Sequence, residues 1–209
     1  PQLATKWATV DENTWYFYLR EDVKFSNGQK MTSEDVVFSI LRAKQPTSDF
    51  KEYISTISGV KAIDDYTVQI KTSKPNPILL NQLSNIFIMS KQWSTDNFVI
   101  APQNWDAGQE TYAATNAMGT GPFKITLREP NTKTVFKKNG KWWGNVEHNI
   151  TEIQLLPIKN AATRVAALLS GEIDIVTDAP VQDLKRIGSS SGHKVESTAQ
   201  MRTIFLGMD

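Results

Sequence analysis

The chain has 209 residues, of which 23 are lysine or arginine, 22 are aspartate or glutamate, two are histidine and none is cysteine. Its hydrophobic share of 40% excludes a disordered or fibrous chain, and its apolar stretches are far shorter than the roughly 20 residues of a membrane-spanning helix. The net charge of +1 gives no electrostatic reason to expect binding to nucleic acid or an anionic membrane. Without cysteine there is no disulfide, thiolate nucleophile or cysteine-based metal site.

The first 75 residues carry clear patterns of secondary structure. Aromatic and β-branched side chains crowd residues 13–20, which predicts a strand. Residues 32–35 (TSED) supply an N-cap and an acidic first turn, so we expect a helix from there to about residue 43. Alternating polarity on both sides of Asp64 and Asp65 predicts a β-hairpin of residues 60–63 and 66–71.

The middle of the chain is less regular. Pro75 and Pro77 pre-set the start of a short helix that ends near residue 83, and residues 86–89 have the composition of a buried strand. Residues 90–118 are polar and aromatic without a clear period, and a helix over 109–116 is the element we expect there.

Strands and helices alternate after residue 118, where the composition changes and a domain boundary is predicted. The expected elements are strands over 123–128, 133–138 and 150–158, a helix over 160–170, a strand over 173–176, a helix over 178–188 and a strand over 203–208. Such alternation is typical of an α/β layer with parallel pairing. Because the chain starts at Pro1 and stops inside the last apolar run, we expect an excerpt of a longer mature protein without its signal peptide.

The sequence carries no complete motif for catalysis or metal binding. His148 and His193 have no ligand residue at metal-binding spacing, and residues 119–124 (GTGPFK) lack the last glycine of a dinucleotide fingerprint. Asp174 and Asp178 lie close in sequence, but helix capping by Asp178 is the simpler interpretation. We therefore predict no catalytic residue, no metal site and no cofactor.

Aromatic residues are numerous, with six Trp, nine Phe and five Tyr. Amphipathic rings can line a ligand groove, although they more often form the core. We expect Trp15, Phe17 and Phe38 in the core, whereas Trp142 and Trp143 fit packing and a partly exposed platform equally well.

Four segments carry motifs in a recognisable order. They are PQLATKW at 1–7 with TWYFYLREDVKFSNGQKMTSEDVVFSI at 14–40, VKAIDDYTVQIKTSKPNP at 60–77, MGTGPFKI at 118–125, and ALLSGEIDIV at 167–176 ahead of RTIFLGMD. Together they resemble the extracytoplasmic solute-binding proteins of the peptide/nickel class (family 5), which serve ABC importers. In two places the chain departs from the family's pattern: NGKWW at 139–143 replaces Asn-Pro-x-Tyr-Trp, and Asp209 replaces the Asn after the last strand.

The resemblance implies an α/β (mixed α+β) fold, namely a type II-like lobe of a periplasmic binding protein with an inserted α+β domain. Residues 1–9 would be the opening segment of the first lobe, 10–117 the inserted domain and 118–209 the α/β part of the first lobe. The second lobe would be missing from this chain.

The resemblance also implies a function. The protein would be the substrate-binding component of an ABC importer, capturing oligopeptides or dipeptides outside the membrane by lobe closure and delivering them to the membrane permease. We expect a monomer without enzymatic activity or a nucleic-acid partner, periplasmic or tethered as a lipoprotein. Chelated nickel, sugars and opines remain alternative ligands.

Segments that line the cleft in such proteins correspond to three places in this chain. They are residues 83–85 (LSN), the Gly-Thr-Gly turn and the final strand, and the ligand-binding residues we expect from them are Ser84, Asn85, Thr120, Gln200, Thr203 and Phe205. For the glycines at 119 and 121 we favour a tight turn over ligand contact. Asp49, Phe50 and Tyr53 could reach the cleft, but we favour a surface loop for them.

Two other classes of function remain open at this point. A secreted hydrolase acting on peptides or glycans predicts a perturbed acid or base in a pocket, for example Asp174 or His193. A carbohydrate-binding or adhesion module predicts an exposed aromatic platform.

Overall fold

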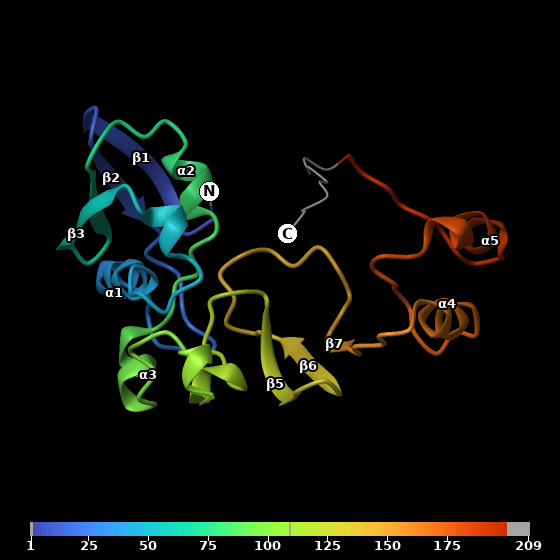
Figure 1. Ribbon diagram of the computed structural model, residues 1–209. Coiled ribbons are helices and arrows are strands. Elements are labelled where there is room, and N and C mark those ends of the chain that lie inside the picture. The colour runs from blue at the N-terminus through green and yellow to red at the C-terminus, as the bar shows by residue number, and fades with distance from the viewer. Residues whose placement is uncertain (1, 109, 200–209) are drawn as a thin grey trace. The chain divides into compact units, whose positions relative to one another are not determined.

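The computed structural model describes residues 2–108 and 110–199 (Figure 1). The chain divides into two compact units, Pro1–Leu156 and Pro157–Asp209. Among the described residues, no helix has the length and apolar character needed to cross a bilayer. The division of the chain at residue 117, expected from the sequence, concerns domains within the first unit and stays a prediction.

A four-stranded antiparallel sheet forms one part of the first unit. Its order is β1-β2-β4-β3, with β1 (Ala4–Asp11), β2 (Thr14–Leu19), β3 (Ile57–Asp64) and β4 (Thr67–Thr72). The predicted strand over 13–20 and the predicted hairpin around Asp64 are therefore confirmed. Strand β1 was not predicted because it is an edge strand with largely exposed side chains, so no buried stripe marks it.

The core of this unit lies between the sheet and helix α1 (Ser33–Ala43), which packs against β3 and β4. The helix begins after Thr32, as its capping residues predict, and it buries Val36 and Ile40. The chain between β2 and α1 adds Phe25 and Met31, both fully buried, on either side of the turn at Gly28. Gly28 has φ +96, a left-handed conformation that glycine adopts without strain.

Short elements fill the rest of the region up to residue 118. They are the 3₁₀ turn η1 (Lys51–Ile54), helices α2 (Leu79–Leu83) and α3 (Lys91–Asp96), and the 3₁₀ turns η2 (Trp105–Ala107) and η3 (Tyr112–Ala114). Helix α2 was predicted, and α3 was not, because a six-residue helix is too short to show a period. The helix expected over 109–116 was wrong, since the described residues 110–116 form only the turn η3.

The expected buried strand over 86–89 was also wrong. These residues pair with no described strand, and Phe87 exposes 76% of its surface. A run of four apolar residues has no periodicity of its own, so sequence pattern alone does not separate a strand from an irregular segment. Hydrogen bonds to α1 and α2 hold the backbone of this segment instead.

A three-stranded antiparallel sheet completes the first unit, in the order β5-β6-β7. Its strands are β5 (Phe123–Glu129), β6 (Lys133–Lys138) and β7 (Glu152–Leu155), the last shorter than predicted. It is joined to the preceding region by contacts far apart in sequence. Ser26 N–H donates to the carbonyl of Gly119 at 2.9 Å, and Lys141 Nζ donates to the carbonyl of Asn27 at 3.0 Å.

The second unit contains helix α4 (Ala161–Leu169), the 3₁₀ turn η4 (Val181–Asp183) and helix α5 (Leu184–Ser189). The predicted helix over 160–170 is confirmed, and both of its ends are capped: Asn160 Oδ1 accepts from Thr163 N–H at 3.0 Å, and Gly171 has φ +77. The strand expected over 173–176 was wrong, since Ile175 is 80% exposed and no described strand lies beside it. The strand expected over 203–208 lies outside the described residues.

Helices and strands together give the mixed α and β class that the sequence predicts. The expected parallel layer is not formed among the described residues, where every ladder is antiparallel. Parallel pairing needs neighbouring strands. Of the two strands expected for this role, the one over 173–176 does not form, and the one over 203–208 lies outside the described residues.

Candidate ligand-binding pocket

The first unit contains a pocket of about 910 Å³, walled by segments from much of its length. Ser84 and Thr120, two of the predicted ligand-binding residues, lie on its wall, as do Arg42 of α1 and Arg128 of β5. Aromatic side chains form a large part of the surface: Phe50, Phe87, Trp93, Trp105, Trp142 and Trp143. The volume lies in the range of roughly 300 to 1,000 Å³ that is usual for small-molecule sites.

A second cavity of about 410 Å³ adjoins the pocket on the sheet side. The two share Gln2, Leu3, Ser84, Ile86 and Ile88, and the last three belong to the segment that lies between them. The walls of the smaller cavity are almost wholly apolar, including Trp7 and Phe17. The irregular segment 84–89 thus separates an aromatic, partly polar space from an apolar one.

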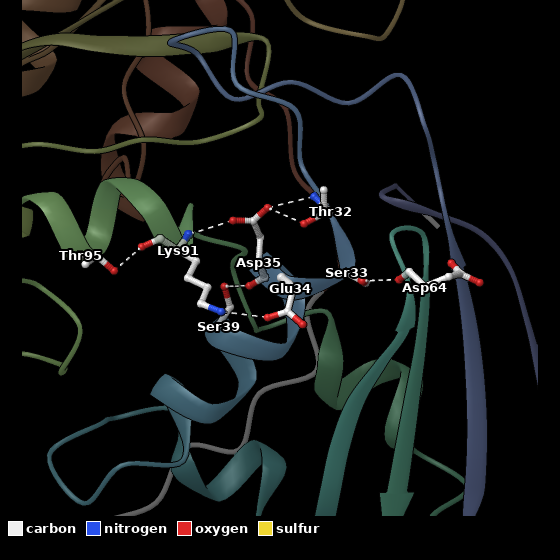
Figure 2. Close-up of polar contacts among 8 residues, drawn as sticks. All are labelled: Thr32, Ser33, Glu34, Asp35, Ser39, Asp64, Lys91 and Thr95. Carbon is white, nitrogen blue, oxygen red and sulfur yellow. Dashed lines mark hydrogen bonds and ion pairs between the residues drawn. The ribbon is translucent and has the colours of Figure 1, made fainter.

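Hydrogen bonds to α1 fix this segment and the start of α3, and Figure 2 shows those at the start of α3. The hydroxyl of Ser39 donates to the carbonyl of Asp35 at 2.7 Å and accepts from Met89 N–H at 2.9 Å. The carboxylate of Asp35, only 4% exposed, accepts from the backbone N–H groups of Lys91 at 2.8 Å and Thr32 at 2.9 Å. Asp35 therefore caps its own helix and also holds the first residue of α3.

The Gly-Thr-Gly segment forms another part of the pocket wall. Asn139, which is 3% exposed, fastens it by donating to the carbonyls of Gly121 at 2.8 Å and Pro122 at 2.7 Å. Neither Gly119 nor Gly121 has a positive φ, and a Cβ at Gly119 would meet no atom within 4 Å. Neither backbone conformation nor crowding therefore requires glycine at these positions, and the choice between a tight turn and ligand contact stays a prediction.

Positive charge outweighs negative charge on the pocket wall. Arg42 donates to the carbonyls of Val99 and Ala101, each at 3.1 Å, and Arg128 donates to the carbonyl of Ala114 at 2.9 Å. Neither arginine forms an ion pair within the described part of the chain. Burial lowers the pKa of Arg42 from its usual value, but a guanidinium stays protonated at neutral pH. Glu110 is the carboxylate on this wall, so the wall carries a net positive charge.

Trp143 is held from outside the pocket by an arginine. The guanidinium of Arg20 lies 4.4 Å from the centre of the Trp143 ring and forms a two-pronged pair with Asp22, at 2.8 and 2.9 Å. The hydrogen bond from Arg20 lowers the pKa of the Asp22 carboxyl. The pKa of Asp22 is lower in the folded state than its ordinary value of 3.8. The pair therefore contributes to stability above pH 3.8, and this contribution is lost as the pH falls through the folded-state pKa.

This pair gives a test by titration. Replacing Arg20 with methionine should raise the pKa of Asp22 toward its ordinary value, because the main cause of the depression is removed. Asp64 is an internal control, since its pKa is lowered chiefly by a backbone hydrogen bond from Tyr66. Carbon-detected NMR of the two carboxyl groups would measure both values. An unchanged Asp22 titration in Arg20→Met would contradict the assignment.

The predicted site residues have different environments. The hydroxyl of Ser84 donates to the carbonyl of Asn81 at 2.6 Å, and Thr120 is half-buried on the pocket wall. The amide of Asn85 donates to the carbonyls of Asn81 and Gln82, so it caps α2 and does not line the pocket. Gln200, Thr203 and Phe205 lie outside the described residues. Ligand contact by any of the six stays a prediction.

The aromatic wall of the pocket, which consists of six rings, was not assigned from the sequence. These rings belong to Phe50, Phe87, Trp93, Trp105, Trp142 and Trp143. Phe50 was expected on a surface loop, yet it lines the pocket, and Phe87 was expected in a buried strand. The usable signal was the unusual density of aromatic residues without periodicity between 87 and 112. The rings of Phe50 and Phe87 meet although they are far apart in the sequence, which no local pattern predicts.

The residues considered for hydrolysis do not form a catalytic group with each other. The ring of His193 faces backbone carbonyls, with Nδ1 3.0 Å from Ser191 O and Nε2 3.1 Å from Leu168 O. Asp178 has φ +55, and its carbonyl accepts from Arg164 at 3.3 Å. Across residues 2–108 and 110–199, no three His, Asp or Glu side chains gather in an arrangement that could hold a metal ion.

Comparison with known proteins decides the family. All of residues 1–209 match the family described as bacterial extracellular solute-binding proteins, family 5 Middle. The chain belongs to this family. The resemblance read from the sequence motifs is therefore confirmed, and with it the fold class.

Among curated relatives of the family 5 chain, the periplasmic murein peptide-binding protein MppA of Escherichia coli is 25% identical, and the periplasmic oligopeptide-binding protein OppA of Salmonella typhimurium is 26% identical. Each alignment covers 98% of this chain and 40% of the relative, so the chain spans about two fifths of their length. The binding protein AgaA of A. tumefaciens R10, solved with agropinic acid, has a TM-score of 0.79 at 26% identity, covering 91% of this chain and 37% of AgaA.

Proposed function

We propose that this family 5 chain is part of the solute-binding component of an ABC importer. The match of the whole chain to that family is the observation that carries the proposal. The pocket of about 910 Å³ supports it, since it offers aromatic contact area together with a few polar groups, as binding sites for small solutes do.

The proposed ligand is an oligopeptide or dipeptide. Peptides of varied sequence share their main chain, so a general site binds main-chain groups and leaves room for the side chains. On the pocket wall, the hydroxyls of Ser84 and Thr120 and the backbone around Gly119 are groups of that kind. The uncompensated arginines Arg42 and Arg128 suit a terminal carboxylate. Two relatives are named for peptide binding, while AgaA was solved with agropinic acid, so an opine is the second candidate ligand.

The proposed mechanism is binding without bond chemistry. A ligand that contacts two lobes at once favours the closed arrangement by its differential affinity for it, and the permease would recognise that closed form. We propose a monomer that acts in the periplasm or outside the membrane as a tethered lipoprotein. No cofactor, metal or catalytic residue takes part in this mechanism. The exposed rings of the pocket wall are also what a carbohydrate-binding module would show, but the match of the whole chain to family 5 favours the importer.

Calorimetry combined with mass spectrometry would test this function. The complete gene product, titrated with mixed dipeptides and tripeptides, is expected to bind them one to one and to leave them intact. Mass spectrometry of the same samples after incubation would detect cleavage. Turnover that Asp174→Ala abolishes would contradict the proposal and favour the hydrolase.

A further inference from the structure

Phe50 and Phe87 form an exposed aromatic pair on the pocket wall. Phe87 exposes 76% of its surface and Phe50 exposes 40%. Their rings meet edge to face, with centroids 6.4 Å apart, and both line the pocket of about 910 Å³. Aromatic rings that stay open on a concave surface leave apolar area for a ligand to cover.

The backbone that carries each ring is held in place. On one side of Phe87, Ile86 N–H donates to the carbonyl of Leu83 at 3.0 Å, and on the other Met89 N–H donates to Ser39. The N–H of Phe50 donates to Ser48 Oγ at 3.2 Å, and the ring of Tyr53 lies 6.3 Å from that of Phe50. Because the backbone is held and the two rings contact each other, they have less conformational freedom to lose when a ligand covers them.

The surroundings of the pair define what it can bind. Ile86, Ile88 and Met89, which flank Phe87 along the wall, are uncharged, and the first two open onto the apolar cavity of about 410 Å³. These flanking side chains offer no ionic partner to a carboxylate or an ammonium group, so a charged group placed against them would lose hydration without compensation from them. The surface therefore suits an uncharged apolar group.

We propose that the Phe50–Phe87 pair binds an aromatic or branched aliphatic side chain of a peptide ligand and so gives the site its side-chain preference. This inference rests on the proposed function and adds the class of peptide. The pair is one wall of the same pocket, and the main-chain contacts of the proposed function are made by other residues.

Binding of four tripeptides to the complete gene product tests the inference. The peptides are Ala-Phe-Ala, Ala-Leu-Ala, Ala-Ala-Ala and Ala-Asp-Ala, measured by calorimetry. We expect the wild-type protein to bind the first two about tenfold or more tightly than Ala-Ala-Ala, because one buried apolar side chain accounts for a difference of that order. In Phe87→Ala this preference should shrink to about twofold or less, with the affinity for Ala-Ala-Ala little changed.

Phe98→Ala is the matched control. Phe98 is 91% exposed and lies outside the pocket, so its removal should leave the preference intact. Phe87→Leu, which keeps an apolar side chain, should retain the preference for Ala-Leu-Ala and guards against misfolding of the alanine variant.

Three outcomes would overturn the inference. Equal binding of all four peptides by the wild-type protein would contradict the inference without contradicting the proposed function. No binding of any peptide overturns the peptide proposal along with it. A Phe87→Ala protein that unfolds at a lower temperature but keeps its preference would assign the pair to packing against another part of the protein.

Discussion

Replacing Asp35 with alanine is expected to lower the free energy of unfolding by about 3 kcal/mol. The carboxylate is 4% exposed and accepts from the backbone N–H groups of Thr32 and Lys91 (Figure 2). Its loss leaves both donors without an acceptor and frees the start of α3, which follows the pocket segment 84–89. Urea unfolding of the complete gene product, with hydrogen exchange at the amides of Thr32 and Lys91, would measure the effect.

Two variants calibrate this prediction. Glu34→Ala removes only the exposed ion pair with Lys91, at 2.9 Å, and should change stability by no more than about 0.5 kcal/mol. Asp35→Asn keeps one acceptor oxygen and should fall between the two. Equal effects of Asp35→Ala and Glu34→Ala would show that Asp35 is not the anchor of this region.

Replacing Gly119 with leucine is expected to weaken ligand binding by about tenfold or more while leaving stability nearly unchanged. Gly119 lies on the pocket wall, has no positive φ, and has no atom within 4 Å of the place where a Cβ would be. A leucine fits the backbone without strain, but its side chain takes space that the ligand would use. Calorimetry and thermal unfolding of the same samples separate the two effects.

Gly140→Leu is the control for this substitution. Gly140 also lacks a positive φ and has open space at its Cβ position, but it does not line the pocket. Its replacement should change neither binding nor stability appreciably. If Gly119→Leu binds ligand as well as Gly140→Leu does, the ligand does not occupy the space beside the glycine.

The elements that could be predicted are those whose own residues carry the signal. Helix α1 has a capping residue, acidic first-turn residues and a periodic apolar face, all within 32–43, and the β3–β4 hairpin alternates around a marked turn. Strand β1 has none of these marks because it is an exposed edge, and it is specified by pairing with β2. Residues 86–89 are the opposite case, because a strand was predicted there and none forms. Their apolar composition indicates burial, but it does not show which of the side chains is covered.

The candidate site could be predicted only in part for a similar reason. Ser84 and Thr120 were named through the resemblance to the family, and both lie on the pocket wall. Asn85 was named on the same basis, but its amide caps α2 by donating to the carbonyl of Asn81. The motif of residues 83–85 does not show which of its polar side chains has such a role. The pairing of Phe50 with Phe87 depends on how η1 and segment 84–89 pack together, which is a tertiary property.

Native mass spectrometry of the complete gene product, purified from cells beside its Gly119→Leu variant, tests the central claim most directly. The claim is that the pocket lined by Gly119, Thr120 and the aromatic wall holds a captured solute. We predict that the wild-type protein carries a bound peptide or similar small molecule, and that the variant carries much less of it. A wild-type protein that never retains a ligand, or a variant that retains the same ligand to the same extent, would contradict the claim.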